Sequence, residues 1–243
     1  GKINGAATAR GETANLAYAQ HLDRLNEPYE LLDSRQMQER CGTDFYRQGL
    51  YTPGTVMLHP AAYVRGVADG LRRRVKICEL SPVLGLRQHA GLWQATTPCG
   101  QVTAPKIIMA VNGHVESFGF FKRRLVHPFL YASMTKALDA EAVRRLGGQS
   151  HWGITPSDPM GSTIRRISGR SGARIIVRNQ STYAANMEVP DHIASAKMRH
   201  HLKSFKTRFP MLADTGMEFS WGGKLCLSLN DVPAFGEIED GVY

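Results

Sequence analysis

The 243-residue sequence contains no apolar run long enough to span a membrane, and its first fifteen residues lack the apolar segment of a signal peptide. We therefore expect a soluble, cytoplasmic protein. The four cysteines are widely separated, with no CxxC pair and no paired histidine spacing, so neither a disulfide framework nor a zinc site is indicated. With 42% hydrophobic residues, the chain can bury one large core or two smaller ones.

Several catalytic signatures are also missing. The sequence has no GxSxG and no HExxH, so serine hydrolase and metalloprotease chemistry lack support. It has no Gly-rich phosphate loop either, and GxGxxG in particular is absent. Most of the nine histidines stand singly, which is the usual pattern of surface or capping residues. We predict no metal site.

The net charge of +9 invites a nucleic-acid-binding hypothesis. Three basic clusters lie at residues 72–74, 122–124 and 199–201. The first closes a predicted helix, where cations suit the negative end of the helix dipole, and the third lies within an amphipathic helix. Because no aromatic residues interleave with these clusters, we expect no nucleic-acid partner. A field that attracts an anionic cofactor or substrate, or simply a solvated surface, explains the charge.

Residues 75–119 carry the clearest local pattern. Apolar runs at 75–80, 83–86 and 106–111, with a polar alternating run at 92–97, are separated by turn residues. This pattern predicts a small antiparallel meander followed by a strand buried on both faces. A glycine soon after such a strand allows a large ligand to lie across the strand end, although it also serves an ordinary turn.

Helical and extended segments alternate along the rest of the chain. His59-Pro60 opens a helix with a predicted buried stripe of Tyr63, Val64, Val67 and Leu71. Further helices are predicted over residues 12–26, 35–41, 139–146 and 190–209, and strands over 130–135, 162–167, 174–177 and 217–221, the last broken by Gly222-Gly223. The fold class is therefore mixed α/β, with antiparallel hairpins in the second part.

Several short motifs occur in an order that resembles the FAD-dependent D-amino-acid oxidase-like superfamily, most closely its gamma-glutamylputrescine oxidoreductase-like branch. They are Tyr46 to Leu50, His59-Pro60, Ser81-Pro82-Val83, Ala110-Val111-Asn112-Gly113, Trp221-Gly222-Gly223 and Asp231 to Gly236. Each motif is weak alone, and their order and spacing carry the resemblance over nearly the whole chain.

The resemblance implies an FAD-binding domain interleaved with a substrate domain, which is built on a mixed, largely antiparallel sheet with flanking helices. The substrate domain would comprise residues 1–55 and 121–225, and a partial FAD-binding domain residues 56–120 and 226–243. The family's GxGxxG would lie upstream of Gly1 and a final flavin segment after Tyr243. We therefore expect an interior fragment of an enzyme that binds FAD weakly or not at all by itself.

The resemblance also implies site residues. The backbone of Val83 would face the adenine of FAD, and Ala110, Asn112 and Gly113 would form the turn beside the cofactor. Arg166 matches a substrate-facing arginine that could pair with a carboxylate, and Tyr131 and Trp221 are candidate pocket walls. A solvated arginine and ordinary core packing explain these last three residues equally well. Some relatives attach FAD through a cysteine, but a buried structural thiol is the commoner state for Cys226.

Two functions of different class follow. In the first, the chain is most of an oxidoreductase that removes a hydride from the carbon of a C–N bond in a small-molecule amine or amino acid and passes it to flavin. In the second, it is a non-catalytic folded module that keeps the substrate-domain scaffold. The sequence does not separate an oxidase from a dehydrogenase.

Overall fold

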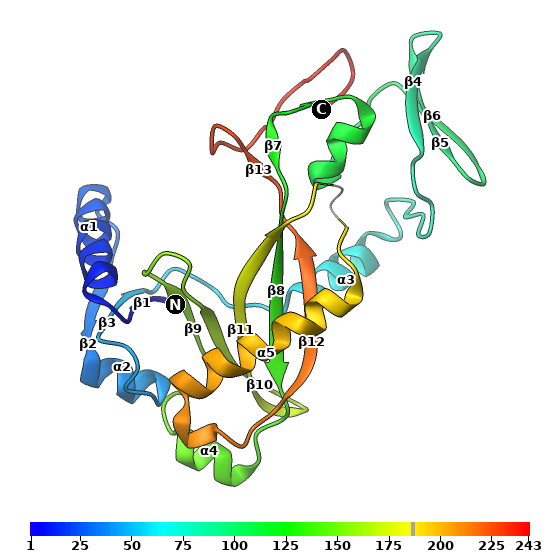
Figure 1. Ribbon diagram of the computed structural model, residues 1–243. Coiled ribbons are helices and arrows are strands. Elements are labelled where there is room, and N and C mark those ends of the chain that lie inside the picture. Colours follow the sequence, from blue (N-terminus) through cyan, green and yellow to red (C-terminus); the bar gives the residue numbers. More distant parts are fainter. Residues whose placement is uncertain (186–187) are drawn as a thin grey trace. The chain divides into compact units, whose positions relative to one another are not determined.

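The computed structural model describes residues 1–185 and 188–243, which group into two compact units (Figure 1). Unit 1 comprises residues 1–57, 129–182 and 189–223. Unit 2 comprises residues 58–128, a short stretch that begins at Tyr183, and residues 224–243. The chain thus passes between the units several times. The assignment of unit 1 to substrate binding and of unit 2 to FAD binding stays a prediction.

Unit 1 is built on an eight-stranded sheet with the strand order β12-β8-β11-β10-β9-β1-β3-β2. The strands are β1 (Lys2–Ala6), β2 (Glu30–Asp33), β3 (Gln48–Thr52), β8 (Pro128–Thr135), β9 (Trp152–Pro156), β10 (Thr163–Gly169), β11 (Gly172–Tyr183) and β12 (Met217–Lys224). The pair β1–β9 is parallel, whereas β1–β3, β2–β3, β9–β10 and β10–β11 are antiparallel. This confirms the predicted mixed α/β fold with a mixed sheet.

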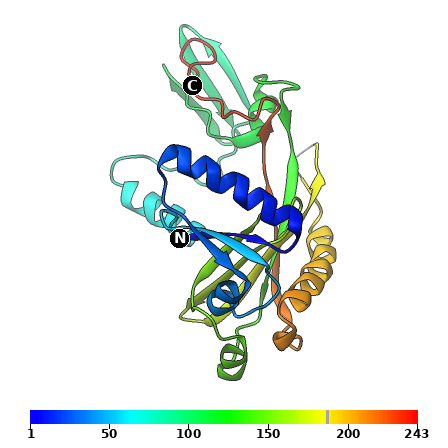
Figure 2. The same ribbon diagram turned by 90° about the vertical axis from the view of Figure 1, so that its left-hand side faces the viewer.

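Helices cover both faces of this sheet (Figure 2). On one face lies α1 (Ala9–Leu25), which packs Ala19 and Leu22 against Leu50 of β3. On the other lie α2 (Ser34–Cys41), α4 (Ala140–Leu146), α5 (Asp191–Arg208) and the short 3-10 turn η2 (Pro210–Leu212). None of the described helices is long and apolar enough to cross a membrane.

Three helices of unit 1, α1, α2 and α4, begin at side-chain caps. The α2 cap is Asp33, which accepts a hydrogen bond from the N–H of Gln36 and whose own N–H is bonded by the Gln36 side chain. Asp33 is therefore the N-cap, and Ser34 is the first residue of α2. Asp139 caps α4 in the same manner, because its carboxylate accepts from the N–H of Ala142 at 2.7 Å.

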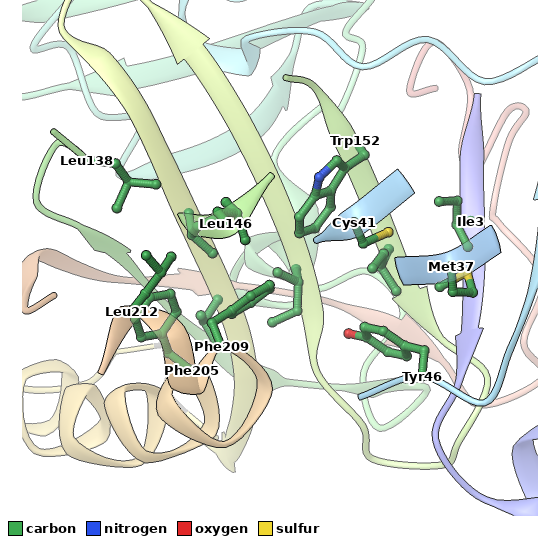
Figure 3. Packing of buried hydrophobic residues seen from close by; sticks show 14 of the residues in the cluster. Ile3, Met37, Cys41, Tyr46, Leu138, Leu146, Trp152, Phe205, Phe209 and Leu212 are labelled. Atoms are coloured by element: carbon green, nitrogen blue, oxygen red, sulfur yellow. The ribbon is translucent and has the colours of Figure 1, made fainter. Parts of the chain in front are cut away.

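The main core lies between the sheet and helices α2, α4 and α5 (Figure 3). Phe205 and Phe209 are fully buried, with ring centroids 5.4 Å apart, and Trp152 of β9 lies 6.1 Å from Phe209. The helix α5 contributes this apolar side and exposes Arg199, Lys203 and Lys206, as its sequence pattern predicted, whereas Lys197 and Arg208 are half-buried. Strand β9, which supplies Trp152 and Ile154, is missing from the sequence-based prediction.

One prediction about β12 is wrong. Gly222 and Gly223 do not break this strand, because both lie within it. A Cβ atom on Gly222 would lie 2.1 Å from the ring of Phe129, whereas nothing lies within 4 Å of the corresponding position on Gly223. Gly222 thus makes room for the ring of Phe129 on the neighbouring strand. Glycine inside a strand can therefore mark close packing as well as a break in the strand.

Unit 2 contains the predicted meander in a shifted form. Its strands are β4 (Gly85–His89), β5 (Leu92–Thr97) and β6 (Gly100–Ala104), paired antiparallel in that order. Residues 75–80, predicted as its first strand, form none. The unit also holds α3 (Pro60–Leu71), the 3-10 helix η1 (Asn112–Phe118) and the two-stranded pair of β7 (Leu125–Val126) and β13 (Leu227–Ser228).

Two burial predictions for unit 2 are wrong. Residues 106–111 form no buried strand: Ile107 makes an isolated parallel bridge to Val242, and Ile108 is 80% exposed. The helix α3 has no buried residue, and its apolar stripe of Tyr63, Val64, Val67 and Leu71 is exposed. The physical reason is the same in both cases, since the described residues of unit 2 provide no second layer over these apolar faces.

Candidate functional site

Three of the four predicted cofactor residues lie at the surface of unit 2. Val83 is 40% exposed, and Ala110 and Asn112 are exposed as well. Asn112 has a left-handed backbone with φ of +54°, and its Oδ1 accepts a hydrogen bond from the N–H of Gly113 at 2.8 Å. Gly113 is buried, and this hydrogen bond already occupies its N–H. The first three residues are therefore free to contact a flat ligand, whereas Gly113 shapes the turn.

FAD also needs a cradle for its pyrophosphate, usually the N-terminus of a helix. At the start of α1 the carboxylate of Asp158 already fills that position, since it accepts from the N–H of Ala7 at 2.8 Å and bonds the hydroxyl of Thr8. At the start of α3, His59 accepts from the N–H of Ala62. Neither helix start therefore offers an open cradle for the pyrophosphate. The contact of Val83, Ala110 and Asn112 with the flat portions of FAD stays a prediction.

The predicted substrate residues lie on strands of unit 1, where side chains alternate between the two faces. Ile164 of β10 is buried in the core shared with α5, so Arg166 points the same way and Arg165 points to the opposite face. Within unit 1, α1 packs on β1 and β3 over part of that opposite face. We call the surface formed there by β8, β10, β11 and β12 the open face.

Arg166 lies on the helix-covered side and is 3% exposed. Its guanidinium donates a hydrogen bond to the carbonyl oxygen of Gly147, at the end of α4. Burial lowers the pKa of this guanidinium from its usual value. Arg166 therefore anchors the end of α4 in this structure and has no surface to offer a substrate.

Tyr131 lies on the same covered side and is fully buried. Its hydroxyl shares a 2.7 Å hydrogen bond with Thr182, and the ammonium of Lys197 on α5 lies 5.9 Å from the centre of its ring. Core packing thus accounts for Tyr131. Neither Tyr131 nor Arg166 reaches the open face, which corrects the interpretation of Tyr131 as a pocket wall and of Arg166 as a substrate-facing arginine.

Trp221 occupies the open face. Ser220 donates a hydrogen bond to the carbonyl of Ala194 in α5, so the alternate residues Phe219 and Trp221 point away from that helix. They are 47% and 43% exposed. The guanidinium of Arg174 on β11 lies 5.5 Å from the ring centre of Phe219. Of the three predicted substrate residues, only Trp221 lies where a ligand can reach it.

Two arginines that the sequence-based prediction did not select lie on the open face. Arg165 on β10 and Arg178 on β11 are both exposed. Strict alternation along β10, counted from the buried Ile164, was the signal that could have identified Arg165 in place of Arg166. The hairpin register then places Arg178 beside it.

Unit 2 has one further group of titratable side chains. His127 is 5% exposed, and its Nε2 lies 2.6 Å from the carboxylate of Glu116. Burial and the nearby Glu116 raise the pKa of the Cys226 thiol, which disfavours the thiolate that covalent attachment of a flavin requires. Among residues 1–185 and 188–243, no cluster of His, Cys, Asp and Glu could hold a metal ion.

This chain was compared with known protein families, sequences and structures. The sequence model of the FAD-dependent oxidoreductase family matches residues 1–243. The chain belongs to this family. It is 25% identical over 224 residues to gamma-glutamylputrescine oxidoreductase of Escherichia coli, covering 90% of this chain and 49% of that protein. It is 22% identical over 227 residues to the probable oxidoreductase OrdL of Haemophilus influenzae, covering 88% and 48%.

Solved structures of the FAD-dependent oxidoreductase fold agree. Glycine oxidase from Geobacillus kaustophilus superposes with a TM-score of 0.79 at 16% identity, covering all of this chain and 63% of that one. L-Proline dehydrogenase from P. horikoshii gives 0.78 at 14% identity, covering all of this chain and 65% of that one. At these identities the likeness shows the fold. The chain spans about half the length of the curated relatives it matches.

Proposed function

We propose that this chain is the part of an FAD-dependent oxidoreductase that presents an amine or amino acid substrate to the flavin, where a C–N bond is oxidised by hydride transfer. The match of the family model to the whole chain carries the proposal. The names of the relatives agree with it, since gamma-glutamylputrescine, glycine and L-proline all contain an oxidisable C–N bond.

The described residues have separate roles in this proposal. Val83, Ala110 and Asn112 would contact the flat portions of FAD, which supplies the hydride acceptor when bound. On unit 1, the open face would orient the substrate, with the exposed ring of Trp221 against its carbon chain. Holding the reacting carbon in a fixed position is the chain's catalytic contribution, because orientation alone removes much of the barrier.

The test is anaerobic reduction of the flavin in a protein that carries this chain in its full reading frame. Addition of an amino acid or amine substrate should bleach the visible absorption band of oxidised flavin, and replacing the hydrogen on the reacting carbon by deuterium should slow the bleaching. A protein that stays colourless with added FAD would contradict the proposal and favour a non-catalytic module. So would a flavin that no amine or amino acid reduces.

A further inference from the structure

The helix α5 carries five lysines and arginines but only one acidic residue, Asp191, at its first position. In Figure 1 this helix lies across the sheet of unit 1, on the helix-covered side. Two of its cations are engaged inside unit 1. The ammonium of Lys197 lies 5.9 Å from the ring centre of Tyr131. The guanidinium of Arg208 lies 4.3 Å from the ring centre of Phe45.

The other three cations, Arg199, Lys203 and Lys206, form one row along α5, which we call the basic stripe. They are spaced by four and then three residues, so they share one face of the helix, and all three are exposed. Like charges at these spacings repel one another and destabilise the helix slightly. The stripe places its three positive charges within about 10 Å along the helix axis.

No carboxylate of the described residues compensates the basic stripe. None of its side chains forms an ion pair with any residue in 1–185 or 188–243. The neighbouring helices differ in this respect. On α2, Arg35 pairs with Glu39. On α4, Arg144 pairs with Glu141. The repulsion within the stripe is therefore relieved only by solvent or by an anion from outside the described residues.

The surface at the stripe is hollowed. A shallow depression of about 470 Å³ is lined by Leu202, Thr207 and the three cations of the stripe. Leu202 is partly buried and packs against the main core, so the depression has an apolar floor and a positive rim. Such a depression accepts a protruding side chain, and its rim favours one with a negative charge.

Two other anionic partners fit the stripe less well than a protein does. A membrane surface binds a basic helix through exposed large apolar side chains or through four or more clustered cations. No large apolar side chain of α5 is exposed. Nucleic acid binds through a longer row of phosphate contacts than three cations supply. The short row matches a short acidic segment.

We propose that the basic stripe of α5 is a docking surface for an acidic segment of a partner protein. A helix with carboxylates three and four residues apart has the matching spacing. The proposal does not rest on the proposed oxidoreductase function, because the stripe contains none of the residues assigned to cofactor or substrate. Loss of docking would leave that function untouched.

The first experiment measures binding of an acidic probe. A fluorescein-labelled oligoglutamate peptide is titrated at low salt with a protein that carries this chain in its full reading frame, and anisotropy is recorded. The stripe variant carries Arg199→Gln, Lys203→Gln and Lys206→Gln. Its matched control removes the same charge from exposed positions of unit 2, through Arg73→Gln, Arg74→Gln and Lys76→Gln. We expect about 10-fold weaker binding by the stripe variant and less than about 2-fold weaker binding by the control.

Equal losses in the two variants, or no binding by the unmodified protein, would overturn the docking surface. The same proteins are titrated with a single-stranded oligonucleotide and sedimented with phosphatidylglycerol vesicles, and we expect weaker binding than to the peptide. Tighter binding of the oligonucleotide or the vesicles, lost in the stripe variant alone, would overturn the acidic protein segment as the partner.

A second measurement separates docking from a structural role. Lys203 lies four residues after Arg199 and three before Lys206, so Lys203→Gln removes two unfavourable pairs. We expect it to raise the melting temperature by about 1–3 °C while it weakens peptide binding. A lower melting temperature together with weaker binding would show that Lys203 supports α5 itself, and would overturn the proposal.

Discussion

The imidazole of His201 should make the stability of unit 1 sensitive to acid. His201 lies on α5 and is fully buried against the sheet. Its Nδ1 lies 2.7 Å from the hydroxyl of Ser133, and its Nε2 lies 3.0 Å from the carbonyl oxygen of Asn179. A carbonyl only accepts, so Nε2 carries the hydrogen and Nδ1 accepts from Ser133, which is the neutral form of the ring.

Burial lowers the pKa of His201 below its usual 6.5, and the positive charges of His200 and Lys197 lower it further. A proton therefore binds more readily to the unfolded chain than to the folded one. The contribution of His201 is complete above the unfolded pKa and is lost as the pH falls from there toward the folded pKa. For one proton, the free energy of unfolding should therefore fall as the pH is lowered through the unfolded pKa, by at most about 1.4 kcal/mol per pH unit.

The control is His201→Gln, whose amide can make both hydrogen bonds and cannot titrate. Urea unfolding of both proteins is followed by tryptophan fluorescence. Trp93 and Trp221 are replaced by phenylalanine in both, so that the signal comes only from Trp152 in the core of unit 1. The difference in the free energy of unfolding between the two proteins should grow as the pH falls below about 6.5, by at most about 1.4 kcal/mol per pH unit, while the contributions of the other histidines cancel. Parallel pH dependences, or a larger relative stability of the histidine protein in acid, would refute the reasoning.

Three further predictions concern packing and cofactor binding. Phe205→Ala should lower the free energy of unfolding by about 3–5 kcal/mol in urea unfolding, because it empties a fully buried site, whereas Leu16→Ala at a 47% exposed position should change it by less than about 1 kcal/mol. Gly222→Ala should cost about 1–3 kcal/mol because the Phe129 ring must move, and Gly223→Ala should cost less; equal costs would contradict this. The 243-residue chain alone should purify colourless, and a visible flavin band that persists through gel filtration would contradict this expectation.

Much of unit 1 follows from short-range patterns. The turn at residues 169–172 and the apolar runs beside it predict the β10–β11 hairpin, and Asp139 with Pro210 predicts where helices begin and end. These features depend on contacts within a few residues of the chain. Strand β9 was missed because it is only five residues long and contains Gly153 and Pro156, which are unfavourable in strands, and because one of its two partners, β1, lies about 150 residues away.

In unit 2, by contrast, the local sequence pattern gave wrong predictions of burial. The stripe of α3 and the apolar run at 106–111 have the composition of buried elements, yet Tyr63 is 61% and Ile108 80% exposed. Apolar periodicity indicates which face of an element can be buried, but a second layer must be present to bury it. The inference from pattern to element was correct for α3, and the inference from element to burial was wrong.

The pair Arg165 and Arg166 shows why a motif match locates a site less well than it identifies a family. Shifting by one residue along a strand reverses the face that a side chain occupies, so a match that is correct to within one position can select the wrong face. Arg166 was selected from the motif and lies bonded to Gly147 inside the core, whereas Arg165 is exposed. The buried neighbour Ile164 decides between them, because residues two apart share a face. Exposure on the strand, and not the match to the motif, therefore decides which of the two arginines a ligand can reach.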